Sequence, residues 1–231
     1  MDDGNYKYIT LMASLPALVA PFIARQVRIS RLRLDTRLRL LDEVDAQLLR
    51  RIEALMEWEQ IHIDMTDAGI VTELDGLMAE LNSETLRTAI LERFELRTVL
   101  SALRRRRRNE PAPAPKTNWG YGRYTEQIRR NWTRPHFGLR RTMYWLGEVR
   151  ELHDSGDTLE LERNIMRIKW DSLDHAAHEH EFNFDAVVLY VLRYNLIARW
   201  LGLSSTVART RFDDMVATGL GGHGSLAAEV A

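Results

Sequence analysis

The chain has 231 residues, of which 45% are hydrophobic and 28% are charged, and its formal net charge is −1. This composition permits a packed core and argues against wholesale disorder, while the balanced charge gives no general attraction to nucleic acid or to an anionic membrane. The chain contains no cysteine, which excludes disulfides, thiolate catalysis and cysteine-ligated zinc.

Residues 9–24 (ITLMASLPALVAPFIA) carry no charge, which raises the question of a signal peptide or a membrane anchor. Asp2 and Asp3 precede this stretch, where a signal peptide has positive charge. Pro16 and Pro21 interrupt helical structure, and the stretch is shorter than the roughly 20 residues needed to cross a bilayer. We therefore expect a buried N-terminal segment.

The next part of the chain predicts amphipathic helices. Apolar residues recur every three or four positions from Thr36 to about Ile61, which is the helical period. The preceding residues 27–34 (VRISRLRL) alternate with a period of two, so a short strand or an extended segment is the alternative there. Two further helices are expected after N-cap residues: 67–81 after Thr66 or Asp67, and 84–103 after Asn82 or Ser83.

The sequence predicts a linker between two parts of the chain at residues 104–118 (RRRRRNEPAPAPKTN). The alternating prolines from Pro111 to Pro115 are incompatible with helix and favour an extended, semi-rigid linker. We expect this segment to be exposed and mobile. The predicted fold is all-α, a multi-helix array of two helical halves joined by a Pro-rich linker: 1–103, the linker 104–118, 119–218, and a flexible tail at 219–231.

The second half predicts five helices: Tyr124–Trp132, Phe137–His153, Thr158–Glu181, Phe184–Leu201 and Ser205–Ala217. The helix from Phe184 is apolar on every face, so other helices should surround it. Arg193 and Arg199 lie within it and are costly in hydrocarbon, which favours a core helix over a membrane span. Asn183 is placed as its N-cap and Gly202 as the residue that ends it.

Residues 170–185 (WDSLDHAAHEHEFNFD) pose a choice between a metal site and a solvated helix face. On a helix, Asp171, His175 and His178 share one face, and two histidines with a carboxylate can bind zinc or non-haem iron. Metal sites in helical bundles converge from several helices through Glu-x-x-His motifs, and this chain has a single such motif, Glu59 to His62. We favour a solvated face with a pH-sensitive histidine pair and predict no metal ligands; a helical metal-binding protein or metalloenzyme is the alternative. His180 is expected to be an ordinary solvated residue.

Two arginine-rich stretches are further candidates. Arg104–Arg108 could grip phosphates or an anionic protein or lipid surface, but cations also suit a helix C-terminus, which we favour. In residues 120–145 aromatic and arginine residues interleave, which can form a stacking platform for single strands. No RNA-binding signature accompanies them. The simpler interpretation places five apolar residues in the core: Trp132, Phe137, Leu139, Tyr144 and Trp145.

No catalytic set emerges from the sequence. Ser14 and Ser172 lack the context of a triad, and nothing distinguishes one pair of carboxylates from the many others. We therefore expect no enzyme activity, no catalytic residues and no cofactor.

The order of several motifs resembles a bacterial family of uncharacterised proteins. YITLMASLPAL near the start is similar to that family's YYYLxxSLPxL signature. NWTRPHFGLRR, WLGEVRELHDSGDTLELER and WDSLDHAAHEHEFNFDAVVLYVLRYNLIARW resemble its W-x-x-x-PF-x-L, its GD-x-L-x-LER and its W-D-x-LD…FD motifs in the same order. The resemblance covers residues 7–24 and 129–216.

This family is encoded among the subunits of V/A-type ATPases and is regarded as similar to the C-type subunit of these enzymes. The resemblance implies a non-catalytic accessory or central-stalk component of a proton- or sodium-translocating rotary ATPase. Its partners would be the rotor-shaft and membrane-ring subunits, not nucleic acid. It would be cytoplasmic and would reach the inner membrane only through the complex.

Overall fold

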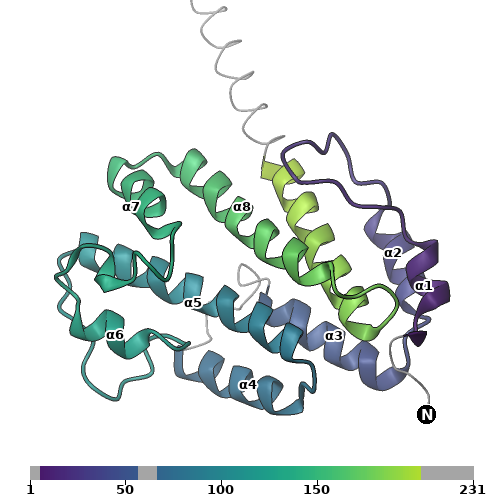
Figure 1. Ribbon diagram of the computed structural model, residues 1–231, viewed down its shortest axis with the longest axis horizontal. Coiled ribbons are helices and arrows are strands. Elements are labelled where there is room, and N and C mark those ends of the chain that lie inside the picture. The colour runs from purple at the N-terminus through teal and green to yellow at the C-terminus, as the bar shows by residue number, and fades with distance from the viewer. Residues whose placement is uncertain (1–5, 57–66, 204–231) are drawn as a thin grey trace, which may run out of the picture.

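The computed structural model of the chain describes residues 6–56 and 67–203, and within these ranges the protein is helical and contains no strand. The all-α prediction is therefore confirmed. The helices are α1 (Ile9–Ser14), α2 (Arg31–Leu38), α3 (Glu43–Met56), α4 (Asp67–Glu80), α5 (Glu84–Arg107), α6 (Thr125–Arg130), the 3-10 turn η2 (Pro135–Gly138), α7 (Leu146–Ser155) and α8 (Thr158–Ala177). A C-terminal helix, Phe184–Leu203, follows α8. In Figure 1, α6 and α7 lie at one end of the molecule and α1 and α2 at the other.

The N-terminal part differs from its prediction in where helices begin. The helix expected from Thr36 is split into α2 and α3, and residues 57–61 of the predicted helix lie outside the described residues. The Asp42 carboxylate accepts a hydrogen bond from the Asp45 amide at 2.8 Å, as an N-cap does, so a new helix starts there. No strand forms at residues 27–34, because Ser30 caps α2 and the helix takes up residues 31–34, half of that stretch.

The apolar N-terminal segment is only partly buried. Leu11 is buried in the core while Ile9 and Ile23 are exposed. The Tyr190 hydroxyl donates a hydrogen bond to the Pro16 carbonyl at 2.9 Å, which ties this segment to the C-terminal helix. The Ser-Leu-Pro stretch at residues 14–16 therefore contacts the C-terminal helix, so the two ends of the described chain lie together.

The long helix α5 joins two hydrophobic clusters. Ser83 caps its start, since the Leu86 amide donates to the Ser83 hydroxyl at 3.1 Å, as predicted. The residues of α5 from Leu86 to Phe94 belong to a larger cluster with α1 to α4 and the C-terminal helix. Those from Leu96 to Leu103 belong to a smaller cluster with α6, η2 and α7. The boundary between the clusters therefore falls at Glu95 within α5, and the chain crosses it again within α8, between Ile165 and Trp170.

The Pro-rich linker between two halves is not confirmed. Helix α5 runs to Arg107, four residues beyond the predicted end at Leu103, so most of the arginine run is helical. The segment after it contacts the smaller cluster, since the Trp132 indole N–H donates to the Glu110 carbonyl at 3.1 Å. The C-terminal helix packs in the larger cluster with α1 to α4, across the predicted division.

The C-terminal helix is long and apolar enough to cross a membrane by length and composition, and 56% of its apolar window is buried inside the protein. Val187, Val188 and Leu189 are fully buried in the larger cluster, which supports the interpretation as a core helix. Asn183 caps it as predicted, because the Ala186 amide donates to the Asn183 side chain at 2.9 Å. Gly202, predicted to end the helix, lies within it.

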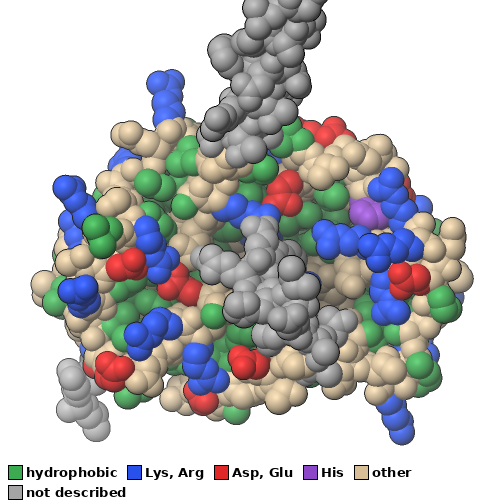
Figure 2. All heavy atoms as spheres, turned by 180° about the vertical axis from the view of Figure 1, so that it is seen from behind, with side chains coloured by type: hydrophobic (Ala, Val, Ile, Leu, Met, Phe, Trp, Pro, Cys, Tyr) green, Lys and Arg blue, Asp and Glu red, His purple; other side chains and the backbone are tan. Residues whose placement is uncertain are grey.

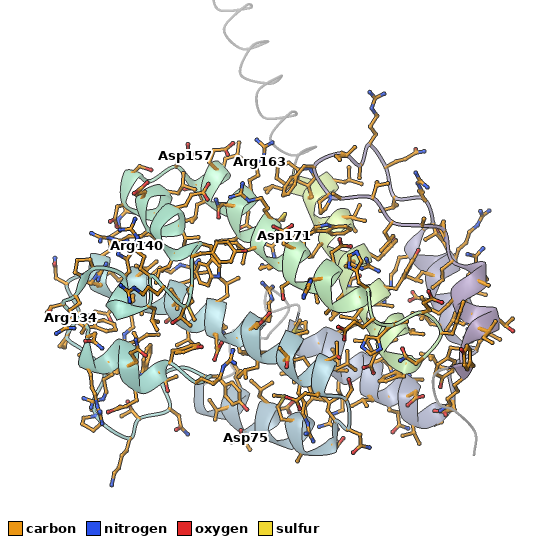
Figure 3. The ribbon with its side chains drawn as sticks, viewed as in Figure 1. Asp75, Arg134, Arg140, Asp157, Arg163 and Asp171 are labelled. Carbon is orange, nitrogen blue, oxygen red and sulfur yellow. The ribbon has the colours of Figure 1, made fainter. Side chains whose placement is uncertain are left out.

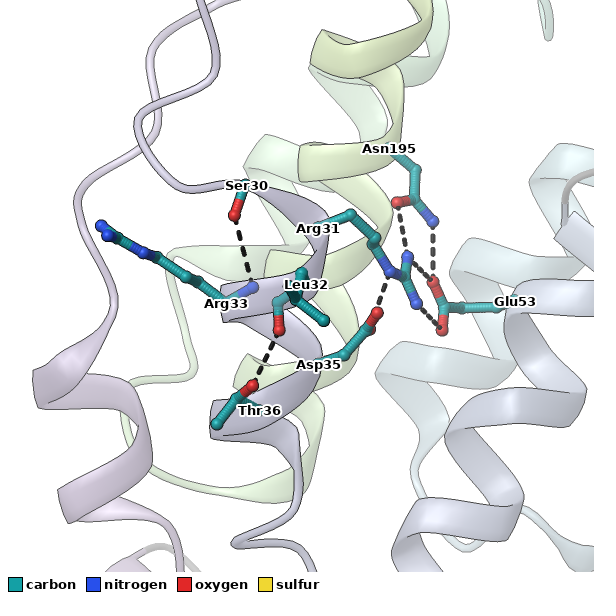
Figure 4. Close-up of polar contacts among 8 residues, drawn as sticks. All are labelled: Ser30, Arg31, Leu32, Arg33, Asp35, Thr36, Glu53 and Asn195. Carbon is teal, nitrogen blue, oxygen red and sulfur yellow. Dashed lines mark hydrogen bonds and ion pairs between the residues drawn. The ribbon is translucent and has the colours of Figure 1, made fainter.

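A polar network fixes the C-terminal helix to α2 and α3 (Figure 4). The Arg31 guanidinium donates to both carboxylate oxygens of Glu53, at 2.8 and 3.1 Å. The Asn195 side chain donates to Glu53 at 2.9 Å and accepts from Arg31 at 3.2 Å. Because bidentate geometry defines direction as well as distance, this network sets how the three helices are rotated against one another.

Two other helices differ from prediction at their ends. The helix expected at Phe137–His153 is replaced by η2, a turn region and α7, because His136 and Phe137 have left-handed φ values of 57° and 51°. Helix α8 ends at Ala177, before the predicted Glu181.

Of the predicted core aromatics, Trp132 and Phe137 are buried, whereas Tyr144 is 81% exposed, so the core placement of Tyr144 was wrong. The helix expected at 205–217 and the tail at 219–231 lie outside the described residues.

We predict that Tyr190→Phe lowers the free energy of unfolding by about 1 kcal/mol at pH 8, because the Pro16 carbonyl loses its donor. Burial raises the pKa of Tyr190 from 10.0 to about 12. The contribution of the neutral phenol is therefore complete below pH 10 and is lost as the pH rises to about 12. Urea unfolding at pH 8 and pH 11 should show a smaller alkaline loss of stability in the variant than in the wild type. An identical loss in both proteins would contradict this assignment.

We also predict that limited trypsin treatment cleaves the 104–118 segment first at Lys116, before the arginines of α5. Lys116 is exposed in a turn and has a φ of 62°. Helical backbone in α5 resists the extended conformation that a protease binds. Mass spectrometry of the first fragments identifies the site, and Lys116→Gln is the control that should remove it. First cleavage after Arg104 or Arg105 would contradict the prediction.

Candidate functional site

Helix α8 carries Asp171 and His175, and His178 follows as its C-cap residue; all three residues are exposed. Asp171 lies in the C-terminal half of α8 (Figure 3). The Nδ1 atom of His178 is 2.7 Å from the Asp174 carbonyl of its own helix. Among residues 6–56 and 67–203, no group of three histidine, aspartate or glutamate side chains could hold a metal ion. Glu59 and His62 lie outside the described residues, so the absence of metal ligands stays a prediction.

His180 is not the solvated residue that the sequence indicated. Its side chain is only 15% exposed, and its two ring nitrogens lie 3.0 Å from the Thr85 hydroxyl and 2.9 Å from the Asn183 amide nitrogen. The Asp185 carboxylate is 3.7 Å away and also contacts the Ser83 hydroxyl. His180 therefore joins the caps of α5 and the C-terminal helix.

The candidate binding site is a cleft of about 720 Å³ bordered by α5, α8 and the C-terminal helix. Apolar side chains of these helices alternate along it with charged groups of both signs. The acidic groups include Glu95 and Asp171, and the cations include Arg123 and Lys169. His175 also lines the cleft, so the structure brings Asp171 and His175, but not His178, to a common concave surface.

Glu95 and Arg123 form a fully hydrogen-bonded pair in the cleft. Glu95 is 4% exposed. It accepts hydrogen bonds from the Arg123 amide and Nε atoms at 2.8 and 2.9 Å and from the Arg123 Nη2 atom at 2.9 Å. These bonds compensate for the burial of a carboxylate. Sequence reasoning missed Glu95, although a lone acid between Phe94 and Leu96 on a core-facing stretch was a usable signal.

Residues 120–122 pack closely against Glu95 and Thr98 of α5. A Cβ atom at Gly122 would lie 2.3 Å from the Glu95 Cγ atom, and the φ of Gly122 is 115°. The Thr98 hydroxyl accepts from the Tyr121 amide at 2.9 Å and lies 2.8 Å from its carbonyl. Glycine is required at Gly122 both by the close approach and by the left-handed backbone.

The charged residues of the sequence motifs are bonded to one another. Asp174 of the W-D-x-LD motif pairs with Arg193 at 2.7 Å, and the Arg193 guanidinium lies 5.9 Å from the centre of the Trp170 ring. Glu162 of the LER motif pairs with Arg199. Asp157 caps α8, since the Glu160 amide donates to it at 3.1 Å. These contacts explain the motif residues as structural, and among the motif carboxylates Asp171 stands out by facing the cleft.

The arginine run at the end of α5 occupies the last helical turn, as the helix-terminus interpretation predicts. The Arg105 Nε atom is 2.9 Å from the Glu110 carboxylate, and the Arg107 guanidinium donates to the His153 carbonyl at 2.8 Å. Arg106 also donates to the Arg134 carbonyl, so at least three of these arginines are used within the fold. The serines considered as nucleophiles are also engaged: Ser14 donates to the Leu11 carbonyl and Ser172 donates to Glu92.

These features define an all-α protein whose motif residues hold helices together. The sequence profile of the family described as "Protein of unknown function (DUF2764)" matches residues 80–218, which is more than half of the chain. The chain belongs to this family. No curated protein and no solved structure matches it.

We predict that Asp174 and Arg193 are energetically coupled by about 1 kcal/mol, the upper end for partly exposed pairs. The two side chains are 38% and 19% exposed, so solvent screens them less than a surface pair. A double-mutant cycle with Asp174→Asn and Arg193→Gln, measured by urea unfolding, gives the coupling. The control is the Glu160–Arg163 pair of the same helix, whose side chains are 48% and 52% exposed and should couple by about 0.3 kcal/mol. Equal coupling in both cycles would contradict the prediction.

Proposed function

We propose that this protein is a non-catalytic accessory or central-stalk component, similar to the C-type subunit, of a bacterial V/A-type proton- or sodium-translocating rotary ATPase. The proposal begins from the ordered resemblance of residues 7–24 and 129–216 to proteins encoded with such ATPases. It places the protein in the cytoplasm, at the inner membrane only through the complex, with rotor-shaft and membrane-ring subunits as partners.

The proposal that the protein has no catalytic role is supported by the contacts of the motif residues, which bond to other helices. Arg193 and Arg199 pair with motif carboxylates on α8, and Tyr190 bonds the Ser-Leu-Pro segment. A catalytic motif would direct its polar groups at a shared reaction centre. Here those groups connect helices, which favours a rigid component of an assembly.

The distribution of exposed apolar side chains supports a protein partner. In the described residues, six of the seven exposed large hydrophobic residues lie between residues 6 and 44: Tyr6, Ile9, Ile23, Leu32, Leu40 and Val44. Exposed apolar residues gathered in one stretch of the chain, on and beside α1 and α2, present apolar side chains that a partner could cover. Helices α1 and α2 would therefore form part of the contact with the complex.

Affinity purification from the native host in mild detergent, followed by mass spectrometry, tests the proposal. Rotor-shaft and membrane-ring subunits should be recovered with the tagged protein and be absent from an untagged strain. A matched variant with Leu32→Ser and Val44→Ser should recover less of them if the N-terminal helices make the contact. Recovery of the protein alone, or with enzymes of an unrelated pathway, would overturn the proposed function.

A further inference from the structure

A second polar feature lies away from the cleft, where the end of α5, the η2 turn and α7 meet. It is a basic cluster formed by Arg106, His136, Arg140 and Arg150. Figure 2 shows lysine and arginine side chains gathered beside a histidine at the α7 end of the molecule. Figure 3 places Arg134 and Arg140 at this same end.

Arg106 is fixed in position, but its charge is not balanced by a bonded acid. Its guanidinium lies 4.7 Å from the centre of the Phe137 ring and donates to the Arg134 carbonyl at 3.1 Å. Among the described residues no carboxylate forms a hydrogen bond or ion pair with it. Burial lowers the pKa of Arg106, and the nearby Arg150 lowers it further. The cation is therefore both partly desolvated and close to like charge.

The surroundings of His136 also carry an excess of positive charge. It is half-buried, and its pKa is lowered first by burial and then by Arg150, Arg140 and Arg106, against a small opposing effect of Glu151. Its left-handed backbone, continued at Phe137 and Gly138, holds it in this position. Left-handed conformations are unfavourable for residues other than glycine and persist where the surrounding structure imposes them.

The nearby carboxylates do not neutralise the cluster. Arg150 pairs with Asp154 at 3.2 Å, and Asp154 is also the acid that acts on Arg106. With Glu151, two carboxylates face three guanidinium groups. No ion pair within the described ranges involves Arg140, which is exposed. Like charges gathered in this way repel, and an anion placed among them would relieve that repulsion.

We propose that this basic cluster is a docking site for a carboxylate-rich segment of a partner protein. Guanidinium groups bind carboxylates in a planar, bidentate manner. Asp154 and Glu151 interrupt the positive surface, and the whole chain carries a net charge of −1, whereas nucleic acids and anionic membranes require extended positive surfaces. The inference deepens the proposed accessory role and rests on it only for the identity of the partner.

The test uses the full-length protein and a fluorescent 16-residue helical peptide with glutamate on one face, compared with the same peptide carrying glutamine. Fluorescence anisotropy at low salt should show binding of the glutamate peptide. The pair Arg106→Gln and Arg140→Gln should weaken binding roughly tenfold, in the range of charge pairs at interfaces. Arg33→Gln is the matched control, because Arg33 is exposed on α2, at the opposite end of the molecule from α7 (Figure 1), and its replacement should leave binding unchanged.

A second measurement guards against a general loss of structure in the double variant. In the wild type, NMR titration of His136 should show its pKa rise when the glutamate peptide binds, since a carboxylate offsets the neighbouring guanidinium groups. Equal binding of both peptides, or no effect of the double variant, would overturn the inference. So would tighter binding to phosphatidylserine vesicles or to a 20-nucleotide single strand that is lost in the same variant.

The two proposals fail in distinguishable ways. If native-host purification recovers ATPase subunits equally with the wild type and the double variant, the accessory role stands and the docking site is refuted. If the peptide binds as expected but purification recovers no ATPase subunit, the docking site stands and the accessory role is refuted.

Discussion

The described structure depends on α5, which belongs to both hydrophobic clusters. One stretch of the helix packs with α1 to α4 and the C-terminal helix, and the next packs with α6, η2 and α7. Glu95 lies between these two stretches of α5. Its buried carboxylate is compensated by Arg123, which follows the proline-rich residues 111–115 in the chain. Because one continuous helix enters both clusters, loosening either cluster would also disturb the other end of α5.

The motif residues make sense as a set of contacts between helices. The attachment of Arg193 and Arg199 to α8, and of Tyr190 to Pro16, fixes the C-terminal helix from two sides. Arg31, Glu53 and Asn195 fix it from a third. An almost entirely apolar helix could pack in several rotations with similar burial. Directional bonds of this kind select one of them.

The basic cluster around His136 differs in kind from these paired contacts. In the helix framework, the motif carboxylates Asp174 and Glu162 each pair with an arginine of the C-terminal helix. Near η2, three guanidinium groups and a histidine converge while fewer acids face them. A local departure from charge pairing, held by left-handed backbone, is the kind of inconsistency that functional sites show.

Local patterns in the sequence determined much of the secondary structure. The helical class, the caps at Ser83 and Asn183, and the burial of the C-terminal helix follow from periodicity and from short-range hydrogen bonding, which neighbouring residues decide. The joining of two clusters by α5, the burial of Glu95 and His180, and the cluster at His136 were decided by tertiary structure. These features bring together residues far apart in the chain, such as Thr85 and His180. A hydrophobic period indicates which face of a helix is buried but not which other element packs against it. Only the packed structure determines these contacts.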